Sequence, residues 1–220
     1  MLRVAIDGPG GTGKSTIAKA VAEELSLEYI DTGAMYRAVA LKCIRNGVAL
    51  DDEAAIIGML ESTDIDFVSS KVTLDGEDVS GLIRTNEVSM AASNVSKFGP
   101  VREKVDAVTR KIASTKNVIM DGRDIGSFVI TDAEVKIFMT ADPAVRAKRR
   151  YDQLLEAGKE ADYDTIFKEI EERDYQDTHR DLHPLKQAED AIYLDTSDMT
   201  IEENIKAVLE IIAKTTEAEA

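Results

Sequence analysis

The sequence has little cysteine and no long apolar run. Because Cys43 is its single cysteine, an intramolecular disulfide and a zinc site built from cysteines are both excluded. Cys43 lies in a helix-like segment, where a small buried apolar residue is the simplest interpretation, and a reducing compartment fits it. No apolar segment approaches the length of a membrane span, and the N-terminal residues lack a signal-peptide pattern. We therefore expect a cytoplasmic protein with no membrane partner.

Positive charge is also scarce. The 220 residues include 27 lysines and arginines against 42 acidic residues, which gives a net charge of -15. This balance argues against a nucleic-acid polymer as partner, because such binding needs clustered basic side chains. A small nucleotide needs only a local basic pocket, and the arginines do gather in a few short segments. The length suits one main domain with room for a small insertion.

What the sequence does contain is a glycine-rich segment directly after the strand-like residues 2–6. It meets the pattern G-x-x-x-x-G-K-[ST] in full, and helical spacing follows it, so its amides and the helix dipole favour an anion. In such a loop Lys14 adds charge near the β and γ phosphates, and Ser15 is placed to bind magnesium. A plain glycine-rich turn gives no reason for Gly-Lys-Ser-Thr at this junction. The residues predicted to bind a nucleoside triphosphate are Gly8, Pro9, Gly10, Gly11, Thr12, Gly13, Lys14, Ser15 and Thr16.

Short apolar runs alternate with helical patterns along the chain. The runs at 2–6, 27–30, 118–120, 135–139 and 191–194 predict buried parallel strands. The helical patterns span 14–25, 34–46, 53–61, 87–96, 101–114, 143–157, 163–179 and 201–214. This alternation predicts a doubly wound α/β fold. Ligands then bind beyond the carboxyl ends of the strands, where Gly8, Asp31, Asp121 and Thr140 fall.

Two segments interrupt the alternation. Residues 64–85 show period-two patterning around Asp75-Gly76, which predicts a small antiparallel insertion with a tight turn. Residues 151–164 are polar and lie between two helical patterns. They fit a mobile flap or, equally, a plain solvated turn between helices. Residues 215–220 are predicted to be a polar tail.

Charged residues follow the third apolar run. Asp121 ends the run Val-Ile-Met, which is where P-loop proteins place a carboxylate near the metal or its waters. Arg123 and Asp124 come directly after it and bring a cation and an acceptor to the same crevice. A structural ion pair is the alternative for these two residues.

Three arginines, Arg146, Arg149 and Arg150, have spacings that place them on one helix face. Like charges repel, so either a bound phosphate or acidic neighbours must offset them. A solvated face is the alternative interpretation.

Further polar residues are ambiguous by spacing alone. Arg173, Asp177 and Arg180 line one side of a helix, a pattern that is more often a salt-bridged surface. Thr32 could cap a helix while Arg37 turns toward an anion, or capping could be the whole role of that segment. His179 and His183 lack the spacing of metal ligands, so we predict structural roles for both histidines.

These segments together resemble the bacterial cytidylate kinases of the nucleoside monophosphate kinase group. The resemblance runs nearly end to end, and the insert is its most specific part. It is carried by Ile6-Asp7-Gly8-Pro9, Asp31-Thr32-Gly33-Ala34-Met35-Tyr36-Arg37, Gly76-Glu77-Asp78-Val79-Ser80-Gly81, Ile83-Arg84-Thr85, Asp121-Gly122-Arg123-Asp124-Ile125-Gly126 and Glu172-Arg173-Asp174.

The resemblance implies a three-layer P-loop NTPase fold with a five-stranded parallel sheet. It places the kinase core at 1–63 and 96–214, a short LID at about 146–164, a nucleoside monophosphate-binding insertion at 64–95 and the tail at 215–220. It implies transfer of the γ-phosphoryl group of ATP to CMP or dCMP with Mg²⁺ as cofactor, by a monomer. The acceptor phosphate is already largely a dianion near neutral pH, so no general base is needed.

The resemblance also implies roles for individual residues. The catalytic set is Lys14, Arg123, Arg146, Arg149 and Arg150, the last three as LID arginines that close on the ATP phosphates. The CMP-binding set is Thr32, Arg37, Ser93, Arg102, Arg123, Asp124, Arg173, Asp177 and Arg180. Ser15 and Asp121 would hold Mg²⁺, the latter directly or through water. Asp124 is suited to accept from the cytosine amino group and to reject uracil.

Two other functions remain open at this stage. A broader pyrimidine kinase would accept UMP as well as CMP. A nucleotide-dependent switch or binding module would hold ATP or GTP without transferring phosphate to a small molecule. Against the switch, the sequence has no guanine-reading Asn-Lys-x-Asp segment, and its clustered arginines suit two phosphorylated ligands better than one.

Overall fold

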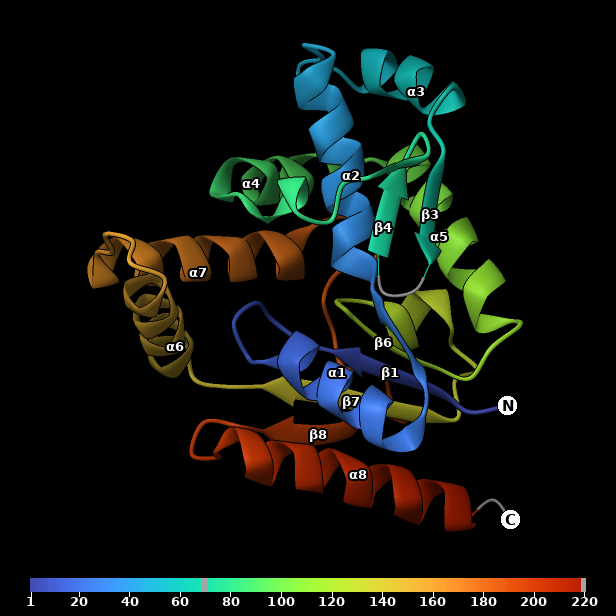
Figure 1. The fold of residues 1–220 in the computed structure, drawn as a ribbon, viewed down its shortest axis with the longest axis vertical. Coiled ribbons are helices and arrows are strands. Elements are labelled where there is room, and N and C mark those ends of the chain that lie inside the picture. Colours follow the sequence, from blue (N-terminus) through green and yellow to red (C-terminus); the bar gives the residue numbers. More distant parts are fainter. Residues whose placement is uncertain (69–70, 219–220) are drawn as a thin grey trace.

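The core of the computed structural model is a five-stranded parallel sheet (Figure 1). The structure describes residues 1–68 and 71–218. The strands lie in the order β2 (Glu28–Asp31), β6 (Val118–Gly122), β1 (Arg3–Asp7), β7 (Val135–Thr140) and β8 (Ile192–Asp195). All four neighbouring pairs are parallel, which confirms the predicted sheet.

Helices cover both faces of the sheet and give three layers. On one face, α1 (Lys14–Leu25) and α8 (Ile201–Ala218) pack against Val4, Ile6 and Ile119. On the other, α2 (Thr32–Arg45) and α5 (Gly99–Ala113) share an apolar cluster with Ala5 and Met120. Successive strand residues thus face opposite layers, as the two-residue period of a strand requires. None of the helices in the described part of the chain is both long and apolar enough to span a membrane.

A second, antiparallel sheet follows α3 (Glu53–Glu61). It contains β3 (Ile65–Val68), β4 (Lys71–Leu74) and β5 (Glu77–Asp78), with β4 in the middle. Asp75 and Gly76, with φ of 51° and 82°, form the predicted tight turn, which needs left-handed backbone at both positions. A short 3₁₀ turn, η1 (Leu82–Arg84), and α4 (Asn86–Val95) complete this part of the chain. Its buried residues join the apolar cluster of α2 and α5, and its division from the core as a unit at 64–95 stays a prediction.

Most of the polar segment at 151–164 is helical or lies in a short turn. Residues up to 156 continue α6 (Pro143–Glu156), and α7 begins at 163 and spans Tyr163–His179. Only a short turn joins the two helices, and Gly158 supplies its left-handed residue with a φ of 68°. Figure 1 shows α6 and α7 as a helical hairpin that projects beside the sheet. Any flap in this region would therefore be the hairpin itself.

The predicted helix end at 214 is wrong, because α8 continues into the polar segment at 215–220. Helix α8 continues to Ala218, and residues 219–220 lie outside the described part. The hydroxyls of Thr215 and Thr216 donate to the carbonyls of Ile211 and Ile212, one turn earlier. Polar side chains that bond back to their own helix satisfy themselves without ending it. Composition alone therefore marked the helix end too early.

Candidate active site

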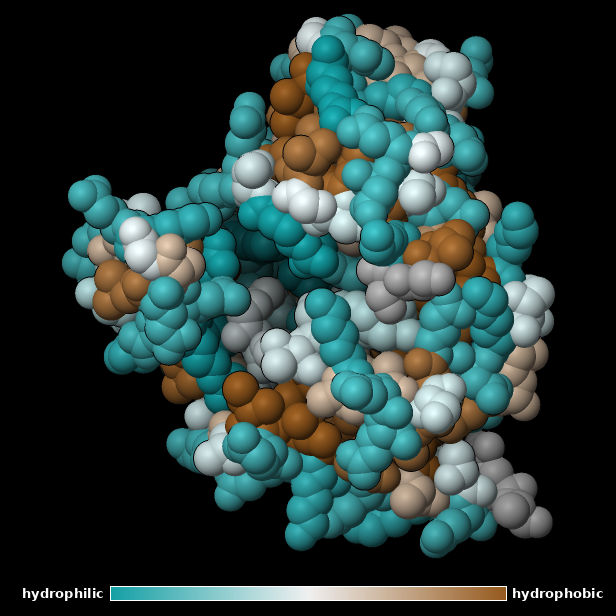
Figure 2. Space-filling model, in the orientation of Figure 1, coloured by the Kyte–Doolittle hydropathy of each residue, from teal (hydrophilic) through white to brown (hydrophobic). Residues whose placement is uncertain are grey.

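A pocket of about 820 Å³ opens beyond the carboxyl ends of the parallel strands. Figure 2 shows it as a hollow lined by hydrophilic side chains between the α6–α7 hairpin and the rest of the molecule. Its walls come from the loop after β1, the start of α2, α4, the end of β6, and the hairpin. Segments far apart in the sequence thus meet at one edge of the sheet, as the strand-end rule predicts.

The glycine-rich loop after β1 takes a conformation that few other residues could adopt. Gly8, Gly11 and Gly13 have φ of 147°, 81° and 94°. A Cβ on Gly8 would lie 1.9 Å from the carbonyl oxygen of Met139, so only glycine lets the loop pass β7. Gly13 begins α1 without a side chain to cap it, which leaves the first-turn amides available to an anion.

Lys14 is folded back onto its own loop. Its side chain is buried, and Nζ donates to the Pro9 carbonyl at 2.6 Å and to Thr12 Oγ1 at 3.2 Å. Burial and the positive charge of Arg123 lower the pKa of Lys14 below its usual range. A polyanion would supply the negative charge that this ammonium lacks.

Oxygen ligands lie next to the loop. Ser15 Oγ donates to Asp121 Oδ2 at 2.8 Å, and the Tyr29 hydroxyl donates to Asp121 Oδ1 at 2.7 Å. Burial and the nearby Asp31 raise the pKa of Asp121. The Asp121 carboxylate and the Ser15 hydroxyl fit Mg²⁺, which prefers hard oxygen ligands and keeps most of its coordination for water and phosphate. Within the described residues no group of three or more His, Cys, Asp or Glu forms a complete metal cage, so such an ion would depend on the nucleotide.

Arginines dominate the opposite side of the pocket. Arg37 pairs with Asp31 at 2.8 Å and Arg123 with Asp177 at 2.7 Å. Burial and the neighbouring Arg123 lower the pKa of Arg173 to about 10. The Nε atoms of Arg37 and Arg173 are buried without a hydrogen-bond partner among the described residues. Buried donors of this kind are normally satisfied, so the geometry calls for an anion beside them.

A second polar group lies deeper in the pocket, around Asp124. This buried carboxylate pairs with Arg102 and lies 3.5 Å from Arg180 Nη2. Arg123 and Asp124 therefore each form an ion pair, but with Asp177 and Arg102 rather than with each other, and all four residues line the pocket. Thr32 and Ser93 lie in the same wall, and Thr32 Oγ1 donates to the Asp121 carbonyl at 2.8 Å. All residues of the predicted CMP set therefore meet in one pocket: Thr32, Arg37, Ser93, Arg102, Arg123, Asp124, Arg173, Asp177 and Arg180.

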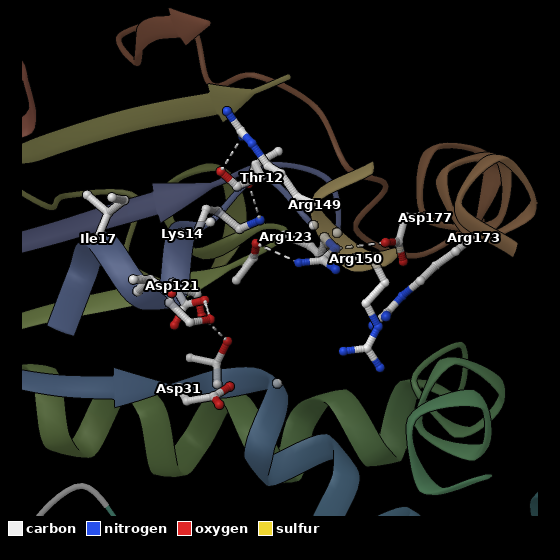
Figure 3. Close-up of a pocket in the computed structure, with 18 of the residues that line it drawn as sticks. Thr12, Lys14, Ile17, Asp31, Asp121, Arg123, Arg149, Arg150, Arg173 and Asp177 are labelled. Carbon is white, nitrogen blue, oxygen red and sulfur yellow. Dashed lines mark hydrogen bonds and ion pairs between the residues drawn. The ribbon is translucent and has the colours of Figure 1, made fainter. Parts of the chain in front are cut away.

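The three arginines of α6 do not share one environment. Arg149 and Arg150 line the pocket, where Figure 3 draws both, and Arg150 Nη1 donates to Gln153 Oε1 at 2.8 Å within its own helix. Arg149 instead donates to the Thr196 carbonyl at 2.6 Å and the Thr12 carbonyl at 3.4 Å. Arg146 is 2% exposed and pairs with Asp174, outside the pocket lining. Helical spacing alone could not show that Arg146 turns into the protein.

Asp7 and His183 lie near the site, although the sequence patterns predict no site role for either of them and a structural role for His183. Asp7 accepts from the amides of Ile125 and Gly126, both at 2.8 Å, and burial raises its pKa to about 7. Its signal was an acid at the end of a buried strand, the same signal that identified Asp121. The ring of His183 stacks on the ring of Phe128, with the two ring centroids 4.5 Å apart. Its Nδ1 lies 3.5 Å from Asp124 Oδ2. No local pattern announces His183, because it reaches the site only through tertiary folding.

Comparison with known proteins places this geometry in a family. Residues 4–214 match the family model described as cytidylate kinase. The cytidylate kinase of Caldicellulosiruptor saccharolyticus is 49% identical over 217 residues, 97% of this chain and 96% of that protein. The cytidylate kinase of Geobacillus sp. (strain WCH70) is 48% identical over 215 residues, 96% of each chain.

Among solved structures, a gluconokinase from Sinorhizobium meliloti 1021 is similar with a TM-score of 0.51. It is 14% identical, and the match covers 99% of this chain and 94% of that one. At this identity the likeness shows the fold alone, which agrees with the predicted P-loop kinase architecture. The match to the family model and the two curated relatives carries more, because it spans the strand ends that build the pocket. The chain belongs to the cytidylate kinase family.

Proposed function

We propose that this protein transfers the γ-phosphoryl group of ATP to CMP or dCMP, forming ADP and CDP or dCDP. The observation that carries the proposal is the presence of two anion-binding centres in one pocket. One is the glycine-rich loop with Lys14, and the other is the arginine group with the unpartnered Nε atoms of Arg37 and Arg173. A single bound nucleotide would occupy only one of these centres and leave the buried donors of the other without an anion.

The donor would bind with its phosphates in the loop. The first-turn amides of α1 and the ammonium of Lys14 would hold the β and γ phosphates. Mg²⁺, held by Ser15 and Asp121 directly or through water, would neutralise charge on the transferring group. Met199, Thr200 and Asn204 line the pocket beyond the loop and would lie beside the donor nucleoside.

The acceptor phosphate would bind between Arg37, Arg123 and Arg173. Its second pKa of about 6 makes it largely a dianion near neutral pH, so its oxygen can attack without a base. The work left to the protein is to align two polyanions and to neutralise charge as the group moves between them. Arg149 and Arg150, carried by α6 along the pocket wall, supply further positive charge for that purpose.

The acceptor base would meet Asp124 and its neighbours. A carboxylate accepts a hydrogen bond from the cytosine amino group, whereas the uracil carbonyl at the same place would leave it unpaired and repelled. Arg102 and Arg180 orient this carboxylate from two sides. This is the reason to propose a cytidine nucleotide as the preferred acceptor.

The proposal is tested by measuring ADP formation from ATP and Mg²⁺ with CMP, dCMP and UMP in turn. We expect ADP formation that depends on CMP or dCMP, with much weaker use of UMP. Lys14→Ala should lower kcat by roughly a hundredfold or more, and Lys206→Ala, at an exposed position on α8, should not.

Other outcomes separate the alternatives. Equal rates with UMP and CMP would favour the broader pyrimidine kinase. Slow ATP turnover that no acceptor accelerates would overturn the kinase proposal and favour a nucleotide-binding module.

A further inference from the structure

Arg146 uses its whole guanidinium group in contacts inside the protein. Nη1 and Nη2 donate to the two carboxylate oxygens of Asp174 at 3.0 and 2.5 Å. Nη1 also donates to the Gly10 carbonyl at 3.0 Å, and Nε donates to the Ala141 carbonyl at 2.8 Å. Arg146 is 2% exposed and the Asp174 side chain is 24% exposed, so this two-pronged pair is largely but not fully shielded from solvent.

The loop passes directly between this pair and the arginines of the acceptor side. A Cβ on Gly11 would lie 3.2 Å from Arg146 Cβ, and a Cβ on Gly10 would lie 3.3 Å from Arg123 Nη2. Glycine at both positions therefore lets the loop contact Arg146 on one side and Arg123 on the other. A shift of Arg146 would move the loop relative to the acceptor arginines.

The carboxylate partner comes from the helix that carries acceptor residues. Asp174 lies in α7 beside Arg173 and one turn before Asp177, and it is not part of the pocket lining. Through Arg146, α7 is thus connected to the Gly10 carbonyl in the donor loop. Helix α7 also contacts the end of β6, because Asp177 pairs with Arg123, the residue that follows this strand.

A direct role of Arg146 on the ATP phosphates would require these contacts to break. The carboxylate of Asp174 and the Gly10 carbonyl would then lose their donor in a mostly buried place, which is costly. Arg149 and Arg150 already line the pocket and can reach a phosphate at no such cost.

We propose that the Arg146–Asp174 pair positions the donor loop against α7, so that bound donor and acceptor are aligned for transfer, and that Arg146 does not itself bind the transferred phosphate. Both are positioning residues. This inference rests on the proposed function for its kinetic readout, and a second readout is independent of any substrate.

Loss of alignment should affect kcat rather than either KM, because each substrate keeps its own binding groups. We expect Arg146→Ala and Asp174→Ala each to lower kcat by roughly tenfold to a hundredfold, with little change in KM for ATP or CMP. The double variant should be no slower than the slower single variant, because both changes remove one shared interaction. Arg146→Lys and Asp174→Asn, which keep part of the pair, should fall between wild type and the alanine variants.

The chain offers a matched control. Arg3 makes a similar two-pronged pair with Glu134, with Nη2–Oε1 at 2.8 Å and Nε–Oε2 at 3.0 Å, at the opposite end of β1 from the loop. Arg3→Ala and Glu134→Ala should lower the melting temperature without changing kcat. This separates positioning from a general loss of stability.

The results that would overturn the proposal are specific. If Arg146 binds phosphate, Asp174→Ala should keep kcat near wild type while Arg146→Ala raises KM for ATP. If the pair is only structural, both variants should behave as the Arg3 and Glu134 controls do.

The second readout is hydrogen exchange of the protein without nucleotide. In Arg146→Ala and Asp174→Ala, exchange should rise together in residues 8–14 and 163–179, and it should stay at the wild-type level there in Arg3→Ala. Unchanged exchange in residues 8–14 would contradict the proposal whatever the acceptor. Failure of the proposed function would instead show in the wild-type enzyme, as ADP formation that CMP does not increase.

Discussion

At the scale of single residues, the site is defined by buried basic groups whose hydrogen bonding is incomplete. Among the described residues, the buried Nε atoms of Arg37 and Arg173 have no hydrogen-bond partner, and Lys14 Nζ donates to neutral oxygens of its own loop. A protein retains such groups at a cost in stability, because desolvated charges need compensation. Bound phosphates would supply that compensation on both sides of the pocket.

Asp124 should determine which acceptor base the protein prefers. Replacing Asp124 by Asn removes a charged acceptor and introduces an amide donor. We expect Asp124→Asn to lower kcat/KM for CMP by roughly tenfold to a hundredfold and to affect UMP much less. Initial rates with both acceptors at saturating ATP provide the measurement.

A control separates this effect from general damage. Asp106 is another buried carboxylate beside His183, 3.9 Å from Nδ1, and it does not line the pocket. Asp106→Asn should therefore lower the rates with CMP and UMP in equal proportion, if it lowers them at all. Equal losses on both acceptors for Asp124→Asn would contradict the base-reading role.

The sequence predicted residues whose placement follows from a strand end. Asp121, Arg123 and Asp124 lie within a few positions of the buried end of β6, so local pattern was sufficient. Arg146 shows the limit of that reasoning. Spacing places it near Arg149 and Arg150, but its partner Asp174 is 28 positions away, and only the packing of α6 on α7 brings them together.

At the scale of elements, β1 connects the two halves of the pocket. The strand leads directly into the donor loop, and its last residue, Asp7, caps the π-helical turn η2 (Ile125–Val129) that follows Asp124. One carboxylate thereby fixes both the entry to the loop and the backbone beside the acceptor-reading residue. A carboxylate that accepts two consecutive amides satisfies groups that a helix start otherwise leaves unpaired.

This arrangement predicts a pH dependence of stability. Burial raises the pKa of Asp7 from 3.8 to about 7 in the folded protein. Between these values the folded state holds a proton that the unfolded state has lost, so this group's contribution to the free energy of unfolding falls as pH rises toward 7. Asp7→Asn removes this dependence. Wild type should therefore lose stability relative to the variant, by an amount on the order of a few kcal/mol, between about pH 5 and about pH 8.

Urea unfolding of both proteins at the two pH values measures the difference. Asp52→Asn is the control, because Asp52 also caps a helix by accepting from the Ala55 amide at 3.0 Å but is exposed to solvent. A free-energy difference between wild type and Asp7→Asn that stays constant with pH would contradict the burial argument.

Hydrophobic periodicity predicted which segments are helices better than it predicted where each helix begins and ends. Helices α1, α3 and α7 match their predicted ranges, while α2 begins earlier because Asp31 caps it by accepting from the Ala34 amide at 2.9 Å. Helix α8 ends later because Thr215 and Thr216 bond within it. Ends depend on single side-chain hydrogen bonds, which hydrophobic periodicity does not report.

At the scale of the whole molecule, an acidic protein encloses a basic pocket. The net charge is -15, yet Lys14 and eight arginines line the pocket. The arginines are Arg37, Arg84, Arg102, Arg123, Arg149, Arg150, Arg173 and Arg180, the last of them beside Asp124. Local positive charge in a crevice attracts small phosphorylated ligands, while the acidic surface disfavours nucleic-acid polymers. The cytoplasmic location, the monomeric state and the domain boundaries remain predictions from the sequence.

The parallel sheet and its layers were predictable because alternation of strand and helix leaves few topologies. The order of the strands within the sheet could not be predicted. Strand β1 lies between β6 and β7, and the crossover connections that decide this order leave no local pattern in the sequence. The proposed function requires one pocket to hold both nucleotides at once.

The most direct test is inhibition by adenosine and cytidine joined through an oligophosphate. If donor and acceptor occupy the two halves of one pocket, this compound should compete with both ATP and CMP and bind more tightly than either, because the second contact becomes intramolecular. Initial rates measured against each substrate in turn give the pattern. Competition with ATP alone, with no effect on the KM for CMP, would contradict the account.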